Sequence, residues 1–122
     1  MLGLMSSPRV RLRDVVGEYV AAVNAFDEDA IVATFADDAL VNDVRREFWC
    51  KDAIRRWVRE EIAGVRVTVE PTGVIEHHGQ TIMRGLYNGD YDKTNLPDEL
   101  ILTSYFTVEK GRIVTLIIIH NS

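Results

Sequence analysis

The stretch FADDALVND, residues 35–43, decides how the chain is read, because it turns from a helix into a strand and carries three aspartates. Asp37 and Asp38 stand together at the expected turn, where water can solvate them. Asp43 differs from them, since it ends the apolar run Ala39 to Val41. A carboxylate in that place lies either on the rim of a core or inside a pocket, and the two possibilities lead to different proteins.

On both sides of this stretch, apolar residues recur at helical spacing. The spacing predicts a first helix over residues 9–26, a short second helix that Asp27 caps, and a third helix over residues 51–63. Between the second and third helices, residues 39–43 are expected to form a short strand.

After Gly64 the period of the apolar residues changes from helical to two. This change predicts four further strands over residues 65–69, 82–87, 100–108 and 113–120, with a long polar loop over residues 88–99. Three helices with one small strand among them, followed by a meander of four strands, are typical of the α+β class. We therefore expect three N-terminal helices packed on one face of a curved antiparallel sheet.

The last predicted strand is apolar on both of its faces. Leu116, Ile118 and His120 alternate with Thr115, Ile117 and Ile119. A sheet with one wet face should show polar side chains on that face. The pattern favours a homodimer in which a second copy covers the outer sheet face. The alternative is a central strand that the chain's own loops bury.

The composition excludes several classes of partner. The chain has 122 residues and a formal net charge of -5, with 14 Lys and Arg against 19 Asp and Glu. It contains no basic run, which argues against nucleic acid and against an anionic membrane surface. Cys50 is its only cysteine, which suits a reducing cytoplasm, and we expect a cytoplasmic protein. Residues 1–8 are predicted to be a flexible tail, and residues 9–122 a single domain.

The run YVAAVNAFDEDAIVATFADDALVND, residues 19–43, closely resembles the opening of the bacterial ketosteroid isomerases. More broadly it is similar to the nuclear-transport-factor-2-like superfamily, which includes the SnoaL-like polyketide cyclases. The resemblance implies a cone-shaped, SnoaL-like domain with one pocket. It also implies that Tyr19 and Asp43 share that pocket, and that Ser104 stands where those isomerases have a protonated aspartate.

These residues suggest a cofactor-free chemistry, with no metal. A carboxyl group that faces an apolar pocket can take a proton from the carbon next to a carbonyl group. The enolate that forms needs a hydrogen-bond donor, which a tyrosine hydroxyl can supply. Asp43 is therefore the expected base and Tyr19 the expected donor, with a small apolar ligand. The alternative is that Asp43 caps a turn or pairs with Arg45 or Arg46.

Other side chains are expected to form the walls of this pocket. Some are apolar residues on inward helix faces or on the concave side of the strands, one is an aromatic residue at the pocket mouth, and two are polar. They are Phe35, Trp49, Trp57, Ser104, Phe106, Leu116, Ile118 and His120.

Three functions are compatible with the sequence. The first is an isomerase or polyketide-cyclase-like enzyme, and the second is a non-catalytic dimeric module that binds small molecules or other proteins. The third is an epoxide hydrolase of the same superfamily, which would need a second carboxylate and a positioning arginine in the pocket. Arg84 is the only arginine on the predicted central strands.

Overall fold

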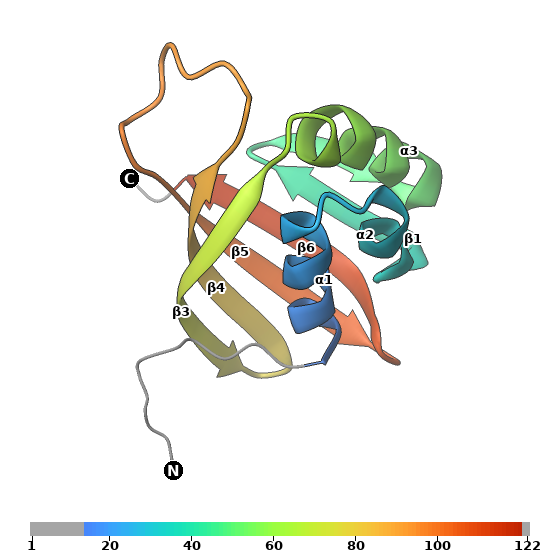
Figure 1. Cartoon of the computed structure of the whole chain (residues 1–122). Coiled ribbons are helices and arrows are strands. Elements are labelled where there is room, and N and C mark those ends of the chain that lie inside the picture. The colour runs from blue at the N-terminus through green and yellow to red at the C-terminus, as the bar shows by residue number, and fades with distance from the viewer. Residues whose placement is uncertain (1–13, 121–122) are drawn as a thin grey trace.

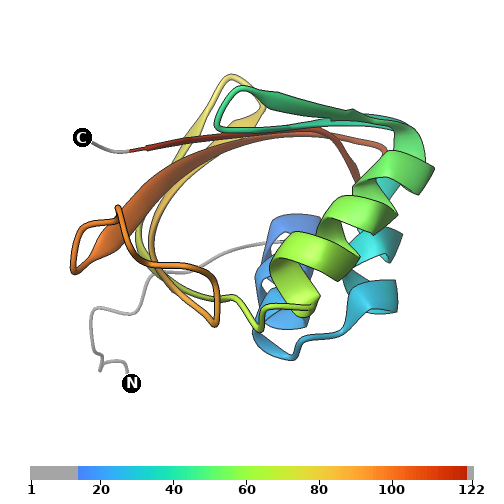
Figure 2. The same cartoon turned by 90° about the horizontal axis from the view of Figure 1, so that it is seen from above.

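The structure is a computed structural model that describes residues 14–120, so the expected tail over residues 1–8 lies outside the described residues. One sheet of six strands, in the order β2-β1-β6-β5-β4-β3, curves around the helices (Figures 1 and 2). The elements are α1 Asp14–Asn24, α2 Glu28–Ala33, β1 Phe35–Asp43, β2 Arg46–Trp49, α3 Cys50–Trp57, η1 Val58–Ala63, β3 Thr68–His77, β4 Gln80–Asn88, β5 Leu100–Glu109 and β6 Arg112–His120.

The predicted α+β class is confirmed, with the helices on the concave side of the sheet (Figure 2). One detail of the sheet differs from the prediction. Strand β1 runs parallel to β6, whereas every other neighbouring pair is antiparallel. A parallel neighbour requires a long connection, and here all of the elements from β2 to β5 lie between the two strands.

The helix ends that the structure describes lie close to where the sequence places them, and the predicted start of the first helix at residue 9 lies outside the described residues. Asp27 caps α2 as predicted, since its carboxylate accepts a hydrogen bond of 3.1 Å from the backbone N–H of Ala30. The third helix widens after Trp57 into the π-helical turns of η1 and ends at Gly64. A Cβ atom on Gly64 would overlap the carbonyl oxygen of Arg59, so only glycine fits there.

The sequence misplaces strand boundaries at the start of the sheet. Strand β1 begins at Phe35, so Asp37 and Asp38 lie exposed in the strand and do not form a turn. Strand β2 was not expected, because Val44 and Arg45 form a two-residue hairpin turn with φ of 49° and 75°. Such turns usually contain Asn or Gly, which tolerate positive φ, and neither residue type is present here.

Strand β3 continues through Pro71, where the prediction ended it. The strand lies at the edge of the sheet, and its pairing with β4 shifts between Pro71 and Gly73. Proline lacks a backbone N–H, and an edge strand with an irregular register tolerates that loss.

The side chain of Asn24 joins α1 to this edge strand. Its amide donates to the carbonyl oxygen of Val69 at 3.0 Å and accepts from the N–H of Val69 at 2.8 Å. Helix α1 is thereby fixed against β3, and its Tyr19 side chain points into the core. Within the described residues, the helices are too short and too polar to span a membrane.

Candidate active site

The sheet register places Asp43 in a row of buried side chains on the concave face. Asp43 at the end of β1 stands opposite Ile118 on β6, Ile118 stands opposite Ser104 on β5, and Ser104 stands opposite Met83 on β4. Neighbouring strands are about 4.8 Å apart, so the backbones of Asp43 and Ser104 are about 10 Å apart. The row crosses the sheet with Ile118 as its apolar centre.

Asp43 is held from two sides. Its Oδ2 atom accepts a hydrogen bond of 3.0 Å from the indole N–H of Trp57 and one of 3.3 Å from Arg46. The Trp57 ring is buried, and a buried indole needs an acceptor for its N–H. Pairing with Arg46 was the expected alternative to a pocket position. The structure shows that pairing, yet the Asp43 side chain is only 17% exposed and lines a hollow.

Arg46 also connects Asp43 to a second carboxylate. Its guanidinium group donates to Glu61 Oε2 at 2.9 Å, and Glu61 lies on η1. The Arg46 side chain is 55% exposed, so solvent screens these ion pairs and they add little to stability. Their effect is geometric, because one arginine sets the spacing between two acids at the mouth of the site.

The hollow that Asp43 lines, here called the mouth hollow, has a volume of about 300 Å³. Its surface is mainly apolar, and its lining includes three acidic residues and His120. The lining residues are Asp43, Val44, Glu60, Glu61, Ile62, Val65, Val67, Tyr87, Tyr91, Leu96, Leu100, Leu102, Ile118 and His120. This volume suits a small ligand.

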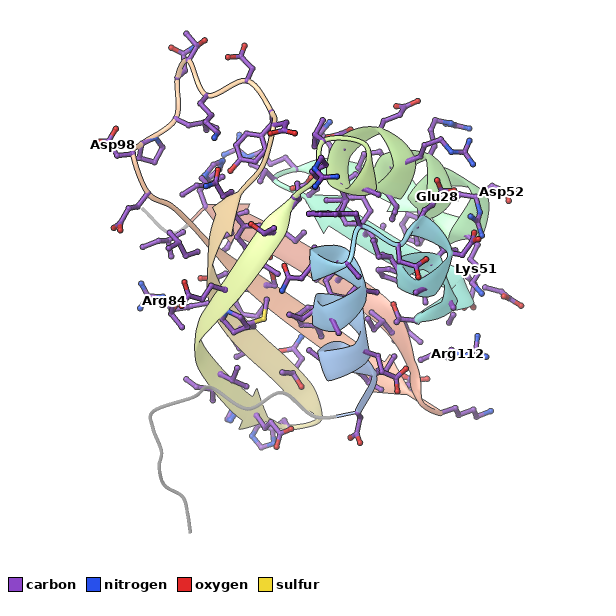
Figure 3. The ribbon with its side chains drawn as sticks, viewed as in Figure 1. Glu28, Lys51, Asp52, Arg84, Asp98 and Arg112 are labelled. Atoms are coloured by element: carbon purple, nitrogen blue, oxygen red, sulfur yellow. The ribbon has the colours of Figure 1, made fainter. Side chains whose placement is uncertain are left out.

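A larger hollow of about 500 Å³ lies against β3, β4 and the loop over residues 89–99. It shares Tyr87, Tyr91, Leu96 and Leu100 with the mouth hollow. Its other lining residues are largely polar and include Asp98, which Figure 3 shows on the loop, pointing away from the helices. Of these two hollows, the mouth hollow is the one that Asp43 lines.

The loop is held against the connection between η1 and β3. The N–H of Asp90 donates to the carbonyl oxygen of Val65 at 2.7 Å. A Cβ on Gly89 would approach the ring of Tyr91 to 2.9 Å, so this glycine allows the ring to pack close to the backbone. The predicted long polar loop over residues 88–99 thus forms one wall of the mouth hollow.

Tyr87 is a wall residue that the sequence reading missed. It lies on β4, and its hydroxyl group is 3.4 Å from the hydroxyl group of Ser104. Gly85 precedes it by two residues on the same face of the strand, and a Cβ there would lie 2.7 Å from Val69 and 3.4 Å from the Tyr87 ring. The spacing Gly85-x-Tyr87 was the available signal, because a strand glycine often accommodates a neighbouring aromatic ring.

Tyr19 lies deeper than predicted. It is buried, its ring packs edge-on against Phe35 and Phe106 at 5.8 and 5.5 Å, and it is not part of the lining of the mouth hollow. Burial raises the pKa of Tyr19 well above its ordinary value, and interactions with Tyr87 and Asp43 raise it further. These interactions require the three groups to be close together.

The structure distributes the other predicted wall residues over three places. Phe35, Trp57, Phe106 and Leu116 are fully buried and form the core beneath the row, and Ser104 is buried within the row. Ile118 and His120 line the mouth hollow. Trp49 is 58% exposed on β2, where its indole donates to Glu47, and it lines none of this hollow.

Metal chemistry has no obvious place in residues 14–120. In this part of the chain, no group of three or more His, Cys, Asp or Glu side chains could hold a metal ion. The expectation that the protein needs no cofactor stays a prediction.

Comparison with known proteins identifies similar chains. The sequence model of the SnoaL-like domain family matches residues 16–116. A proposed polyketide cyclase from Sinorhizobium meliloti is 30% identical, with a TM-score of 0.78, over 88% of this chain and 94% of that chain. No curated protein sequence matches the chain.

Two more distant structures are similar in fold alone. The epoxide hydrolase/cyclase-like enzyme SalBIII, described for pyran ring formation in the polyether salinomycin, is 20% identical with a TM-score of 0.77 over 88% of each chain. A hypothetical protein with a ketosteroid isomerase-like fold from Catenulispora acidiphila, solved with trimethylamine, is 15% identical. Its TM-score is 0.77 over 91% of this chain and 88% of that chain.

Tyr19, which is buried, and Tyr87, which is half-buried, predict a delayed alkaline titration. Burial raises the pKa of Tyr87 to about 12, although its hydrogen bond with Ser104 opposes that increase, and Tyr19 shifts in the same direction. The native protein therefore keeps protons that the unfolded chain releases near pH 10, and stability falls as the pH rises from about 10 to about 12. Ultraviolet absorbance of phenolate should rise later in native than in urea-unfolded protein, and Tyr87→Phe should reduce the delay. Coincident titration curves for native and urea-unfolded protein would contradict the raised pKa values of the two tyrosines.

Proposed function

Because the chain belongs to the SnoaL-like domain family, we propose that it is a cofactor-free enzyme of the isomerase or cyclase type. Its substrate is a small, mostly apolar carbonyl compound. One observation carries this proposal: Asp43 lines a mainly apolar hollow while its Oδ2 atom is anchored by Trp57. The similarity to a proposed polyketide cyclase supports the same class of reaction.

The reaction begins with proton transfer to Asp43. Both hydrogen bonds that the described side chains make to this carboxylate end on Oδ2, so Oδ1 is the oxygen that takes the proton. The proton leaves the carbon next to the carbonyl group, and the C–H electron pair becomes the double bond of an enolate. Asp43 then returns the proton to another carbon. Alternatively, the enolate carbon attacks a second carbonyl group and closes a ring, the π electrons of that carbonyl move to its oxygen, and this oxygen takes the proton from Asp43.

The enolate oxygen requires a donor, and Tyr19 is the first candidate. A tyrosine phenol is protonated at neutral pH, as a donor must be, and burial raises the pKa of Tyr19 further. A preorganised donor of this kind contributes about 10²- to 10³-fold to the rate. Asp43 is the base, and general-base catalysis contributes about 10²- to 10⁴-fold.

A second candidate function is the opening or closing of a cyclic ether. It is favoured by the pair Asp43 and Glu61, which both line the mouth hollow and share Arg46. One carboxylate would take a proton from a hydroxyl group or water as that oxygen forms a bond to an epoxide carbon. The other, when protonated, would donate its proton to the epoxide oxygen as the C–O bond of the ring breaks. Arg84 does not supply the positioning arginine, because it is exposed and points away from the helices (Figure 3).

The base assignment is tested by deuterium exchange. In deuterated buffer, wild-type protein should accelerate exchange at the carbon next to the carbonyl group of a flat cyclic ketone such as 2-tetralone. Asp43→Asn keeps the side-chain shape, and it should reduce the exchange rate by about 10²-fold or more because the base is lost. Proton NMR of the ketone measures the rate.

Asp38→Asn is the matched control, since Asp38 is an exposed carboxylate on the same strand. This variant should exchange at the wild-type rate. Wild-type exchange in Asp43→Asn would remove Asp43 from the reaction. If wild-type protein binds the ketone but accelerates no exchange, the non-catalytic binding module becomes the better account.

We also propose that the protein is a homodimer through the outer sheet face. The strand register places Ile117, Tyr105, Ile82 and Ile75 opposite one another, which makes an apolar row across β6, β5, β4 and β3. Ile75 is 63% exposed and Ile119, on the same face, is 41% exposed. A row of this kind can pair with its own copy across a twofold axis.

Sedimentation tests the dimer. The wild-type protein should sediment at twice the chain mass of 13.8 kDa. Ile117→Asp places a charge at the β6 end of the row and should give the chain mass, with helix and strand content unchanged by circular dichroism. A wild-type protein that sediments as a single chain at high concentration would contradict the dimer.

A further inference from the structure

The wall of the mouth hollow carries a second phenol that the proposed reaction has not yet used. Tyr87 lines the hollow that Asp43 lines, whereas Tyr19 lies behind that lining. Ser104 is buried next to Tyr87, with the two hydroxyl oxygens 3.4 Å apart. A hydroxyl pair therefore occupies the position at which the resemblance to the isomerases leads one to expect a carboxylic acid.

The role of this pair depends on how many hydrogen bonds its two hydroxyl groups can donate. Each hydroxyl group has one proton to donate, and either oxygen can accept. If Ser104 donates to Tyr87, the phenol proton is free for a ligand oxygen. The separation of 3.4 Å exceeds that of a strong O–H···O bond, so Tyr87 gives up little when its hydroxyl turns toward the hollow.

The position of Tyr87 is set by its neighbours on the sheet. Gly85, two residues before it on the same face, carries no side chain, so the Val69 side chain and the Tyr87 ring fill the space beside its backbone and the ring can lean along β4 toward Ser104. Ser104 lies in the row that ends at Asp43, with the apolar Ile118 between them. A ligand lying over Ile118 would therefore have the carboxylate at one end and the hydroxyl pair at the other.

We propose that Tyr87 is a second catalytic donor to the substrate oxygen, and that Ser104 positions it by donating to its phenol oxygen. The proposal rests on the proposed function. In it, the uncharged hydroxyl groups of Tyr87 on β4 and Ser104 on β5 take the place of the carboxylic acid that the resemblance to the isomerases leads one to expect. No proton is transferred to the oxyanion in this step, because the phenol keeps its proton and only donates a hydrogen bond. The substrate is therefore a carbonyl compound whose oxygen gains negative charge as the enolate forms, and a phenol can imitate that enolate.

The test uses 2-naphthol as the probe, because its hydroxyl group imitates an enol on a flat apolar ring. Naphthalene has the same ring without the oxygen. Tyr87→Phe should lower the affinity for 2-naphthol about tenfold, which is the effect of losing one hydrogen bond to an oxygen of partial charge. It should leave the affinity for naphthalene unchanged. Ser104→Ala should lower the affinity for 2-naphthol by a smaller factor, again without changing the affinity for naphthalene. Fluorescence titration measures both ligands.

Tyr105→Phe is the matched control, because Tyr105 lies on β5 in the outward-facing row, away from the hollow. This variant should bind both ligands like the wild-type protein. Equal weakening of 2-naphthol and naphthalene in Tyr87→Phe would mean that the ring shapes the site and donates nothing. An unchanged affinity for 2-naphthol, or a selectivity lost only in Tyr19→Phe, would also overturn the proposal.

Exchange kinetics separate this proposal from the function on which it rests. Tyr87→Phe should lower kcat for exchange of 2-tetralone with little change in KM, as expected when a donor acts mainly in the transition state. If Asp43→Asn abolishes exchange while Tyr87→Phe leaves kcat unchanged, the proposed function stands and the second donor is wrong. If Tyr87→Phe loses 2-naphthol selectivity while Asp43→Asn exchanges normally, the donor stands and the base is wrong.

Discussion

The parallel pairing of β1 with β6 is the constraint on which the site depends. It sets Val41 opposite Leu116 and Asp43 opposite Ile118, so the last residue of β1 faces the concave side of the sheet. A shift of one residue would turn Asp43 to the outer face and Asn42 inward. The N–H of Val44 also donates to the carbonyl oxygen of Ile118 at 2.9 Å, which extends the pairing past the end of the strand. Trp57 then holds the carboxylate from α3.

The carboxylate of Asp43 and the hydroxyl groups of Ser104 and Tyr87 lie apart from one another across the sheet, and the proposed reaction uses this separation. Asp43, Glu61 and Tyr87 line the mouth hollow from three different elements, β1, η1 and β4. In the proposed reaction Asp43 has taken the proton when the enolate exists, but an enolate oxygen next to the Glu61 carboxylate would be destabilised by like charge, so the oxyanion donor is better placed away from the Arg46–Glu61 pair. The apolar Ile118 between Asp43 and Ser104 removes water, which strengthens the interactions of both ends of the row with a ligand.

Much of the architecture could be predicted from local patterns. The Asp27 cap, the change of period after Gly64 and the strand-end acid Asp43 are signals carried by neighbouring residues, and each corresponds to a feature of the structure. Strand β2 could not be predicted, because the turn at Val44 and Arg45 uses residues that rarely adopt positive φ. Trp49 was assigned to the pocket mouth for the same reason, since a loop was expected in place of an outward-facing strand.

The missed parts of the site all depend on contacts between distant segments. Arg46 meets Glu61 only because the β1–β2 hairpin packs beside η1, and Tyr87 meets Ser104 only through the pairing of β4 with β5. Sequence spacing contains no information about these contacts. Tyr19 was expected to line the pocket, yet its helical position alone could not distinguish the wall from the layer behind it.

The proposed chemistry requires that Asp43 and a tyrosine hydroxyl group reach the same ligand in the mouth hollow. A crystal structure with 2-naphthol bound tests this requirement. We expect the naphthyl ring over Ile118, its edge toward Asp43, and its oxygen about 3 Å from the hydroxyl group of Tyr87 or Tyr19. A ring bound outside the mouth hollow, or an oxygen that pairs with Arg46 while both phenols remain out of reach, would contradict it.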